Sequence, residues 1–505
     1  MPKRAAKKPL VILISLLSAS ALLHSLLPLR TTIQIGADEG FELAKATLLL
    51  KGYHFYTEVW NDQPLLHTFL TTEVLKHLSP SVLDPRLVTS VFAVLLLTST
   101  FFISRRIGGL LVAALTTALL IASPGFLELG SSCMVEIPGL APAVTGLCVL
   151  LVGRQSKFHV AEMLAGFCFA VALQVKFIGV IYLPLAGLIL WLREHGTGFQ
   201  PSANTNIPLV ARSSRDGWAE LFRSSVFVAS SLVIGFIAIH LLIGEGSFWL
   251  QLKQSWLSHF ASTKSFEYGS PADHPFEWSI FLKNWDTTIP AILGVILSLR
   301  QIRTTRTAVI PLAWLALDLV VFGIHKPWWS YYYIHNAVPL CWCAAIGLEA
   351  AWKKVNPRRT PVLFTLVAVY ALSAGAWMVS RVYLQVTGIR HSPQIYSSLV
   401  LTEIQRFKPY TKFIYTDEPI YSFHAGIPVP PKLGIIPLKR LWSGDMTNEK
   451  IAAELWTTKP ELVLLANNTR AVPFDDLLAA EYRLVYQDDE HRLYAQKAVI
   501  AQVKY

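Results

Sequence analysis

Long apolar runs separated by short polar segments occupy the chain from near its start to about residue 380. The first run extends from Leu10 to Leu29, and a helix of that length, at about 1.5 Å per residue, crosses about 30 Å of hydrocarbon. Similar runs follow, so the pattern predicts a multi-pass α-helical membrane protein with about eleven spans, or about twelve to thirteen in an alternative count. The further predicted spans are residues 86–103, 108–124, 136–152, 158–175, 177–192, 224–243, 288–299, 308–324, 335–352 and 361–380.

Lysine and arginine collect in alternate connections between these runs, which sets the predicted orientation. Short cytoplasmic loops attract positive charge, so we assign the basic segments to the cytoplasm and the acid-bearing loops between them to the outer side. The amino terminus is then predicted inside and the carboxyl terminus outside a cell (inner or plasma) membrane. The basic segments lie within residues 3–8, 105–106, 154–157, 193–223, 300–306 and 353–359.

Two segments of the sequence allow a second structural interpretation. The first run could be a signal peptide, since basic residues precede it and Ala19-Ser20-Ala21 resembles a cleavage site, but the run continues to Leu29 and favours a retained helix. The stretch from Pro64 to Leu78 is apolar but contains Glu73 and Lys76, and counting it as a span would put every later basic segment outside. We predict an interfacial or re-entrant helix there.

After about residue 385 the apolar pattern ends, and we predict an extracytoplasmic domain over residues 386–505, following a membrane domain over residues 1–385. Phe413–Thr416, Glu461–Leu465, Tyr482–Tyr486 and Arg492–Gln496 read as strands, and Asn448–Trp456 reads as a helix opened by Thr447. A small soluble α/β domain results. Asn467-Asn468-Thr469 is a glycosylation sequon.

Composition narrows the classes of protein. The 505 residues are 53% hydrophobic and only 15% charged, with a mean hydropathy of +0.44, which excludes an ordinary soluble protein. The net charge of +11 belongs to cytoplasmic loops that face membrane lipid, so we expect no nucleic-acid partner. The five cysteines show no disulfide or zinc spacing.

Acids, bases and aromatic residues gather in the predicted outer loops, which extend over residues 30–85 and 244–287 and over shorter connections. Such a set suits a reaction between a lipid-borne phosphate and a hydroxyl, in which a carboxylate takes the hydroxyl proton and cations stabilise the departing phosphate. The candidates are Asp38, Glu39, Asp62, Gln63, Glu136, Lys176, His325, Lys326, Tyr331 and Tyr332.

The order of these motifs resembles the GT-C glycosyltransferases of the protein mannosyltransferase and aminoarabinose-transferase superfamily, of the family 39 and 83 type. An Asp-Glu pair follows the first span, Gly52-Tyr53 precedes an acid-x-Pro-Leu segment at Asp62, and His325-Lys326-Pro327 precedes three tyrosines. Members transfer a sugar from a polyprenyl-phosphate donor to an acceptor, with inversion. The resemblance therefore implies a membrane glycosyltransferase acting on the outer face.

By that resemblance Asp38 is the general base, with Glu39 as its neighbour. Members of the family often have Glu-Lys-Pro-Pro where this chain has Asp62-Gln63-Pro64-Leu65, so a phosphate-binding lysine is missing. Lys176, Lys326 or His325 could replace it. A divalent cation bound by Asp38, Asp62 and Glu136 could also supply the charge, although the sequence has no dedicated metal spacing.

Each candidate also has a simpler interpretation. Asp38 and Glu39 could only begin a helix, Lys176 could extend to the interface, and the tyrosines could belong to an interfacial aromatic belt. Asp318 lies within a predicted span and needs a partner or a cavity. A transporter or flippase of a lipid-linked or small substrate is the alternative function, and a ligase that moves a whole glycan would share the architecture. The residues do not specify the sugar, the polyprenol or whether the acceptor is a lipid, glycan or protein.

Overall fold

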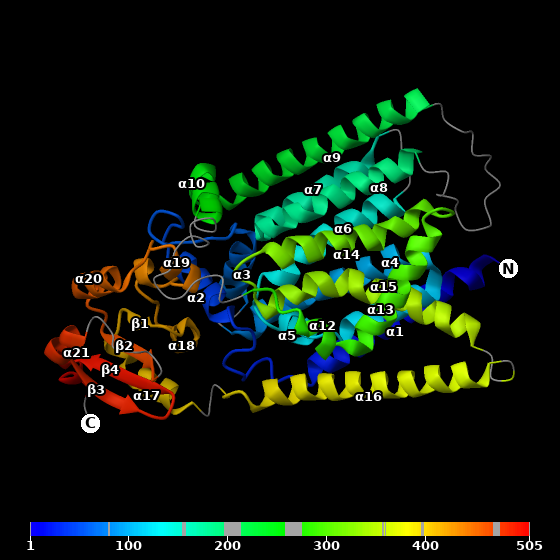
Figure 1. The fold of residues 1–505 in the computed structure, drawn as a ribbon. Helices are drawn as coiled ribbons and strands as arrows, with labels where there is room; N and C mark the ends of the chain where they lie inside the picture. Colours follow the sequence, from blue (N-terminus) through cyan, green and yellow to red (C-terminus); the bar gives the residue numbers. More distant parts are fainter. Residues whose placement is uncertain are drawn as a thin grey trace.

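The computed structural model describes residues 2–78, 81–153, 158–195, 214–257, 275–355, 358, 360–394, 398–467 and 475–503. A bundle of long helices carries a smaller domain at one end, and the amino terminus lies at the opposite end (Figure 1). Parts of some predicted features lie outside the described residues, namely Arg154 and Lys157, the Asn468-Thr469 portion of the sequon and the 258–274 portion of the second outer loop.

The long helices of the bundle overlap the predicted spans, although α1 ends at Ser25 and not at Leu29. Seven helices in the described part of the chain are long and apolar enough to cross a membrane, and α6 and α7 are shorter apolar helices. The predicted multi-pass α-helical fold is confirmed. The helices are α1 (Pro2–Ser25), α2 (Glu39–Leu50), α3 (Leu66–His77), α4 (Leu83–Ile121), α5 (Phe126–Ser131), α6 (Glu136–Val152), α7 (Val160–Val175), η1 (Phe177–Tyr182), α8 (Leu183–His195), α9 (Ser214–Ile243), α10 (Phe248–Leu252), η2 (Lys253–Leu257), α12 (Ser279–Lys283), α13 (Trp285–Gln301), η4 (Arg306–Ala308), α14 (Val309–Ile324), η5 (Ser330–Tyr332), α15 (Tyr333–Lys354) and α16 (Pro361–His391).

Helix α4 contains two of the predicted spans and folds back on itself. A straight helix of 39 residues would be about 58 Å long. Yet the Ser90 hydroxyl, near its start, donates a hydrogen bond of 3.0 Å to the carbonyl of Gly130, beyond its end. Gly109, with φ 85° and ψ −173°, makes the reversal, in a conformation that a side chain would disfavour. The two predicted spans 86–103 and 108–124 are therefore the arms of a hairpin.

Long-range contacts group the connections as the charge pattern predicts. At one end the Arg306 guanidinium donates to the His195 carbonyl at 3.2 Å, which joins two of the basic segments. At the other end Arg381 forms an ion pair of 2.9 Å with Asp286 and donates to the Ala122 carbonyl. The basic and acidic connections thus lie at opposite ends of the bundle.

Glycines let α13 and α15 approach closely near the centre of the bundle. A Cβ at Gly294 would overlap the carbonyl oxygen of Cys343, and one at Gly347 would overlap that of Pro290. Small residues allow such backbone contact where hydrophobic forces between helices are weak. Helix α16, by contrast, lies along the side of the bundle (Figure 1), and only 6% of its most apolar window is buried.

The carboxyl-terminal domain is a four-stranded mixed sheet with helices, as predicted. The strand order is β1-β2-β4-β3, with β1 parallel to β2 and the other pairs antiparallel. The strands are β1 (Ile414–Thr416), β2 (Leu462–Ala466), β3 (Tyr482–Gln487) and β4 (His491–Gln496). The helices are α17 (Leu399–Phe407), η7 (Lys408–Tyr410), α18 (Pro419–Ala425), η8 (Pro431–Leu433), α19 (Leu438–Trp442), α20 (Asn448–Thr458), α21 (Asp475–Glu481) and α22 (Lys497–Ile500). Thr447 caps α20 by accepting from the Lys450 amide.

This domain packs directly on the first outer loop. Helix α18 lies against α2, where a Cβ at Gly40 would come 2.8 Å from the Ile420 amide nitrogen. Ile33 and Leu43 of the loop belong to the same apolar cluster as the core of the sheet. The His424 ring also contacts the Ile33 carbonyl at 2.8 Å. The contact buries apolar side chains from both parts, so the domain is docked rather than loosely tethered.

Candidate active site

Asp38 stands at the N-cap of α2, at the end of the bundle that carries the carboxyl-terminal domain. Its side chain makes no capping hydrogen bond to the helix backbone, so the helix-cap interpretation does not explain it. The side chain is half-buried. A carboxylate in this position is available to a reacting group.

Four of the other predicted residues surround Asp38. The Lys176 ammonium forms an ion pair of 2.5 Å with Glu136 and lies over the rings of Tyr331 and Tyr332, at 5.7 and 4.9 Å from their centroids. Glu136, Lys176 and Tyr331 are all close enough to Asp38 to shift its pKa. Lys176 is buried between α7 and η1, so the simpler interpretation of a lysine extended to the interface does not apply.

The surroundings favour the protonated form of Asp38 more than water does. Burial raises the pKa of Asp38, and the negative charge of Glu136 raises it further, while Tyr331 and Lys176 act in the opposite direction. A carboxylate with a raised pKa is a stronger proton acceptor than an ordinary aspartate.

Glu39 has entirely different surroundings. Its side chain is 0% exposed and accepts two hydrogen bonds of 2.8 Å from the guanidinium of Arg86. The backbone amides of Ile35 and Cys133 donate to the same carboxylate at 2.8 and 2.9 Å. Arg86 also binds the carbonyls of Leu29, Thr32 and Ile33. Glu39 thus connects α2 to Arg86 of α4 and to Cys133, just before α6. These bonds also fix the backbone beside Asp38.

Asp62 and Gln63 lie in a second polar group, one helical turn along α2 from Asp38. Asp62 is 8% exposed and accepts from the Gln63 amide at 3.1 Å. Lys45 of α2 lies 3.9 Å from Asp62, and Lys439 of α19 forms an ion pair with it. Glu42 and Lys439 each interact electrostatically with Asp38. The two polar groups are therefore linked by charge.

Glu42 and Lys45 form the buried floor of this second group. Their side chains bind at 2.8 Å, and the His67 ring lies 3.7 Å from Glu42. Burial opposes ionisation of Glu42, but Lys45 and His67 outweigh it and lower its pKa to about 2. Lys45 and His67 therefore favour the ionised form of Glu42.

His325 and Lys326 lie on the neighbouring loop after α14. The His325 ring packs edge-on against Tyr332, with 5.4 Å between centroids, so it belongs to the aromatic wall of the Asp38 group. The Lys326 side chain is exposed. Of the proposed substitutes for the missing lysine, Lys176 lies nearest the base.

The described residues contain no group of three or more His, Cys, Asp or Glu side chains that could hold a metal ion. Asp62 is flanked by Lys45 and Lys439, and Glu136 is bound by Lys176. Asp38, Asp62 and Glu136 are thus not gathered into one such group, and lysines supply positive charge beside Asp62 and Glu136.

Several residues of the site were missed in the sequence. Glu42 and Lys45 follow Asp38 at helical spacing, so a helix prediction over residues 39–50 would have placed them on its face. Arg86 gave a weaker signal, as an arginine at the outer edge of a span. Lys439 gave none, because nothing in the sequence brings α19 to the first outer loop.

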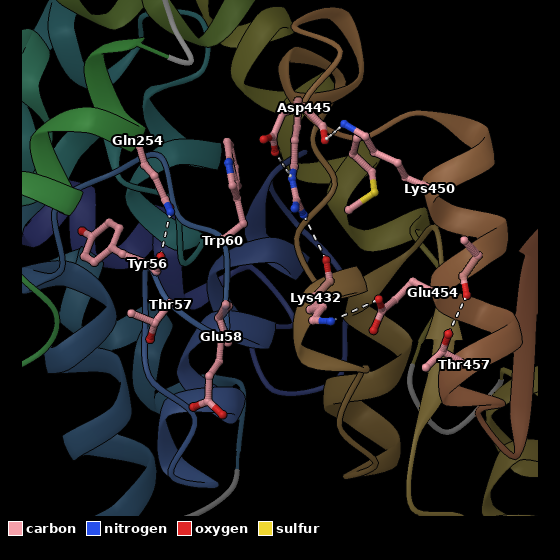
Figure 2. A pocket seen from close by; sticks show the side chains of 14 residues that line it. Tyr56, Thr57, Glu58, Trp60, Gln254, Lys432, Asp445, Lys450, Glu454 and Thr457 are labelled. Atoms are coloured by element: carbon pink, nitrogen blue, oxygen red, sulfur yellow. Dashed lines mark hydrogen bonds and ion pairs between the residues drawn. The ribbon is translucent and has the colours of Figure 1, made fainter.

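A groove of about 530 Å³ separates that loop from the carboxyl-terminal domain. Figure 2 shows Tyr56, Glu58 and Trp60 on one wall and Lys432, Asp445 and Glu454 on the other. The groove is lined by acids, bases and aromatic rings, a mixture that suits a polar ligand.

Asp318 lies in α14 and is fully buried, as its position in a span predicts. The Trp314 side chain, one turn away in α14, interacts with its carboxylate. Tyr182 lies nearby and binds the His335 ring at 2.6 Å. The acid is therefore near polar groups inside the bundle and away from lipid.

Comparison of the sequence with models of protein families and with curated proteins gives no match. Comparison of the fold with solved structures does give matches. The fold is similar to that of ArnT from Cupriavidus metallidurans in the apo state, with a TM-score of 0.64, 14% identity and coverage of 99% of each chain. The structure of ArnT from the same organism bound to undecaprenyl phosphate gives a TM-score of 0.61 at 14% identity, over 95% of this chain and 97% of the other chain.

AglB, an archaeal oligosaccharyltransferase from Archaeoglobus fulgidus, was solved with an inhibitory peptide and a dolichol-phosphate. It gives a TM-score of 0.55 at 12% identity, over 90% of this chain and 69% of the other. At such low identity the likeness establishes the fold. The chain is a multi-pass membrane protein with the GT-C fold, followed by a small α/β domain.

Proposed function

We propose that the protein is a membrane glycosyltransferase that moves a sugar from a polyprenyl-phosphate donor to an acceptor hydroxyl on the outer face of the membrane. The observation that carries the proposal is the placement of Asp38, half-buried beside Glu136, Lys176 and Tyr331. The GT-C fold supports it, because two proteins of that fold were solved with polyprenyl phosphates.

In the proposed reaction Asp38 accepts the proton of the acceptor hydroxyl as that oxygen attacks the anomeric carbon. The bond between that carbon and the donor phosphate oxygen breaks, and the polyprenyl phosphate leaves with the electron pair. Attack opposite to the leaving group inverts the anomeric carbon. Lys176 and the tyrosine hydroxyls stabilise the negative charge that develops, in a setting where burial strengthens the effect.

The Oε2 atom of Glu136 supports a substrate site here. It is buried and has no hydrogen-bond partner within the described residues, although Oε1 binds Lys176. An unpaired buried carboxylate oxygen is costly, and a sugar hydroxyl could donate to it. We therefore expect Glu136 to contact the sugar, with Lys176 held between it and the phosphate.

Transport of a lipid-linked substrate is less well supported. Transporters place their binding sites near the middle of the membrane, often at broken helices. Here Asp38, Glu136 and Lys176 lie close to Glu42 and to Lys439 of the docked domain. An enzyme at the membrane surface fits that placement better.

The proposal is tested with purified full-length protein, a labelled polyprenyl-phosphate sugar and envelope acceptors. Asp38→Asn should reduce transfer by about 100-fold or more, because general-base catalysis contributes about that much. Glu73→Gln is the matched control, since Glu73 is a carboxylate of the same outer loop that binds only surface neighbours on α3.

Thermal unfolding of both variants checks that the fold is kept. Full transfer activity in Asp38→Asn would exclude this residue as the base. Absence of transfer by the wild-type protein from every polyprenyl-phosphate sugar tested, with any acceptor, would contradict the function itself.

A further inference from the structure

Gln63 stands where members of the resembled family often have a lysine, and the structure places Lys439 beside it. Gln63 donates to the Oδ2 atom of Asp62 at 3.1 Å, and the Lys439 ammonium binds the same oxygen. The ammonium therefore lies beside the Gln63 amide. It comes from α19, in a different domain and far along the chain.

We propose that Lys439 binds the phosphate of the polyprenyl-phosphate substrate in place of a loop lysine, an inference that rests on the function proposed above. The carboxyl-terminal domain is then part of the donor site. The domain contributes the Lys439 ammonium, which lies at the edge of the group of residues around Asp38.

Two residues that follow Lys439 in α19 hold this helix against the rest of the protein. The Arg440 guanidinium lies over the Trp60 ring, 5.1 Å from its centroid, and is held by Asp445 at 2.7 Å. Trp442 stacks on Trp329 of the late loop, with centroids 6.2 Å apart and planes inclined by 6°. The domain thus contacts both the first outer loop and the connection after α14, and these contacts position α19.

Lys439 is better placed for a ligand than the other lysines near Asp38. Lys45 is almost fully buried and bound to Glu42, and Lys176 is buried and bound to Glu136. The side chain of Lys439 is 22% exposed. An ammonium has three donors, so Lys439 can keep its bond to Asp62 while it binds a phosphate oxygen.

The pKa of Lys439 is sensitive to the charges around its ammonium group. Burial and the positive charge of Lys45 lower its pKa to about 7, against the attraction of Asp38 and Glu42. Asp62, Asp38 and Glu42 already attract the ammonium, and a further negative charge would favour its charged form more. A phosphate would supply that charge and stabilise the ammonium.

The test measures equilibrium binding of labelled undecaprenyl phosphate, and of uncharged undecaprenol, to the purified full-length protein. Lys439→Gln should weaken binding of the phosphate by about 10- to 100-fold, the usual effect of a charged hydrogen bond, and leave undecaprenol unchanged. Lys459→Gln is the matched control, because Lys459 is an exposed lysine of the same domain, bound to Glu481 at 2.8 Å. It should bind as the wild type does.

A second variant separates phosphate binding from domain docking. Gln63→Lys in the Lys439→Gln background returns a lysine to the loop and should restore phosphate binding, even if Lys439→Gln lowers thermal stability. Equal binding by wild type and Lys439→Gln, or no restoration by the double variant, would overturn this inference alone. A wild-type protein that binds undecaprenol as well as its phosphate would overturn the proposed function too.

Discussion

Two adjacent acids, Asp38 and Glu39, have opposite roles because a helix begins between them. Successive side chains of a helix point about 100° apart. Glu39 therefore turns inward to Arg86, while Asp38 faces Glu136, Lys176 and Tyr331. The buried ion pair fixes the direction of the base, since leaving Arg86 unpaired would cost about 3–5 kcal/mol.

The pH dependence of transfer should report on Asp38. Its pKa is raised, so the active base form is lost as pH falls through a value above that of an ordinary aspartate. Glu136→Gln removes a negative charge and should lower the pKa of Asp38, so the acid limb of kcat/KM against pH moves to lower pH. Lys176→Arg keeps its charge and should leave the limb in place. An acid limb that moves to higher pH in Glu136→Gln would contradict Asp38 as the titrating group.

The candidate residues near the first outer loop could be predicted because their motif order and the sidedness of the loops are local features of the sequence. Asp38, Glu136, Lys176 and the two tyrosines lie together as loop order suggested. The distinction between Asp38 and Glu39 could not be predicted, because it depends on where Arg86 packs. Lys439 could not be predicted either, because it requires the docked position of α19.

At the scale of elements, paired glycines determine how closely helices pack. Gly294→Ala should lower thermal stability, by about 1–3 kcal/mol, because its Cβ would overlap the backbone of α15. Gly187→Ala in α8 is the matched control, since nothing lies within 4 Å of a Cβ there. It should be neutral or slightly stabilising, because alanine favours a helix. Thermal unfolding in detergent distinguishes the two, and equal midpoints would show that α13 and α15 separate easily.

The approximate positions of the helices could be predicted from the lengths of the apolar runs. The conformations of the connections between helices could not. The hairpin in α4 was expected as two spans, because Arg105 and Arg106 interrupt the apolar pattern. The reversal itself depends on one positive φ at Gly109. The length of α16 was also underestimated, since it continues to His391, past the last predicted apolar residue, where Arg390 binds the Leu26 carbonyl at 2.8 Å.

At the scale of the whole molecule, the positive charge of alternate connections predicts which end faces the cytoplasm. Thr57 and Thr457 are exposed at the end with the soluble domain, and Thr305 is exposed in a basic connection. In a chain without its native cysteines, Thr57→Cys and Thr457→Cys should react with a membrane-impermeant thiol reagent in intact cells. Thr305→Cys should react only after permeabilisation. Labelling of all three in intact cells would contradict the predicted orientation.

The Arg86–Glu39 pair also determines an order of assembly. Glu39, Arg86 and the Cys133 amide are all synthesised within the first third of the chain, so the housing of the base can form while the ribosome still holds the remaining helices. Lys439 emerges near the end of translation. If Asp38 and Lys439 act as proposed, chains that stop early would carry the oriented base but lack the donor cation of α19, and they should not bind the proposed lipid substrate.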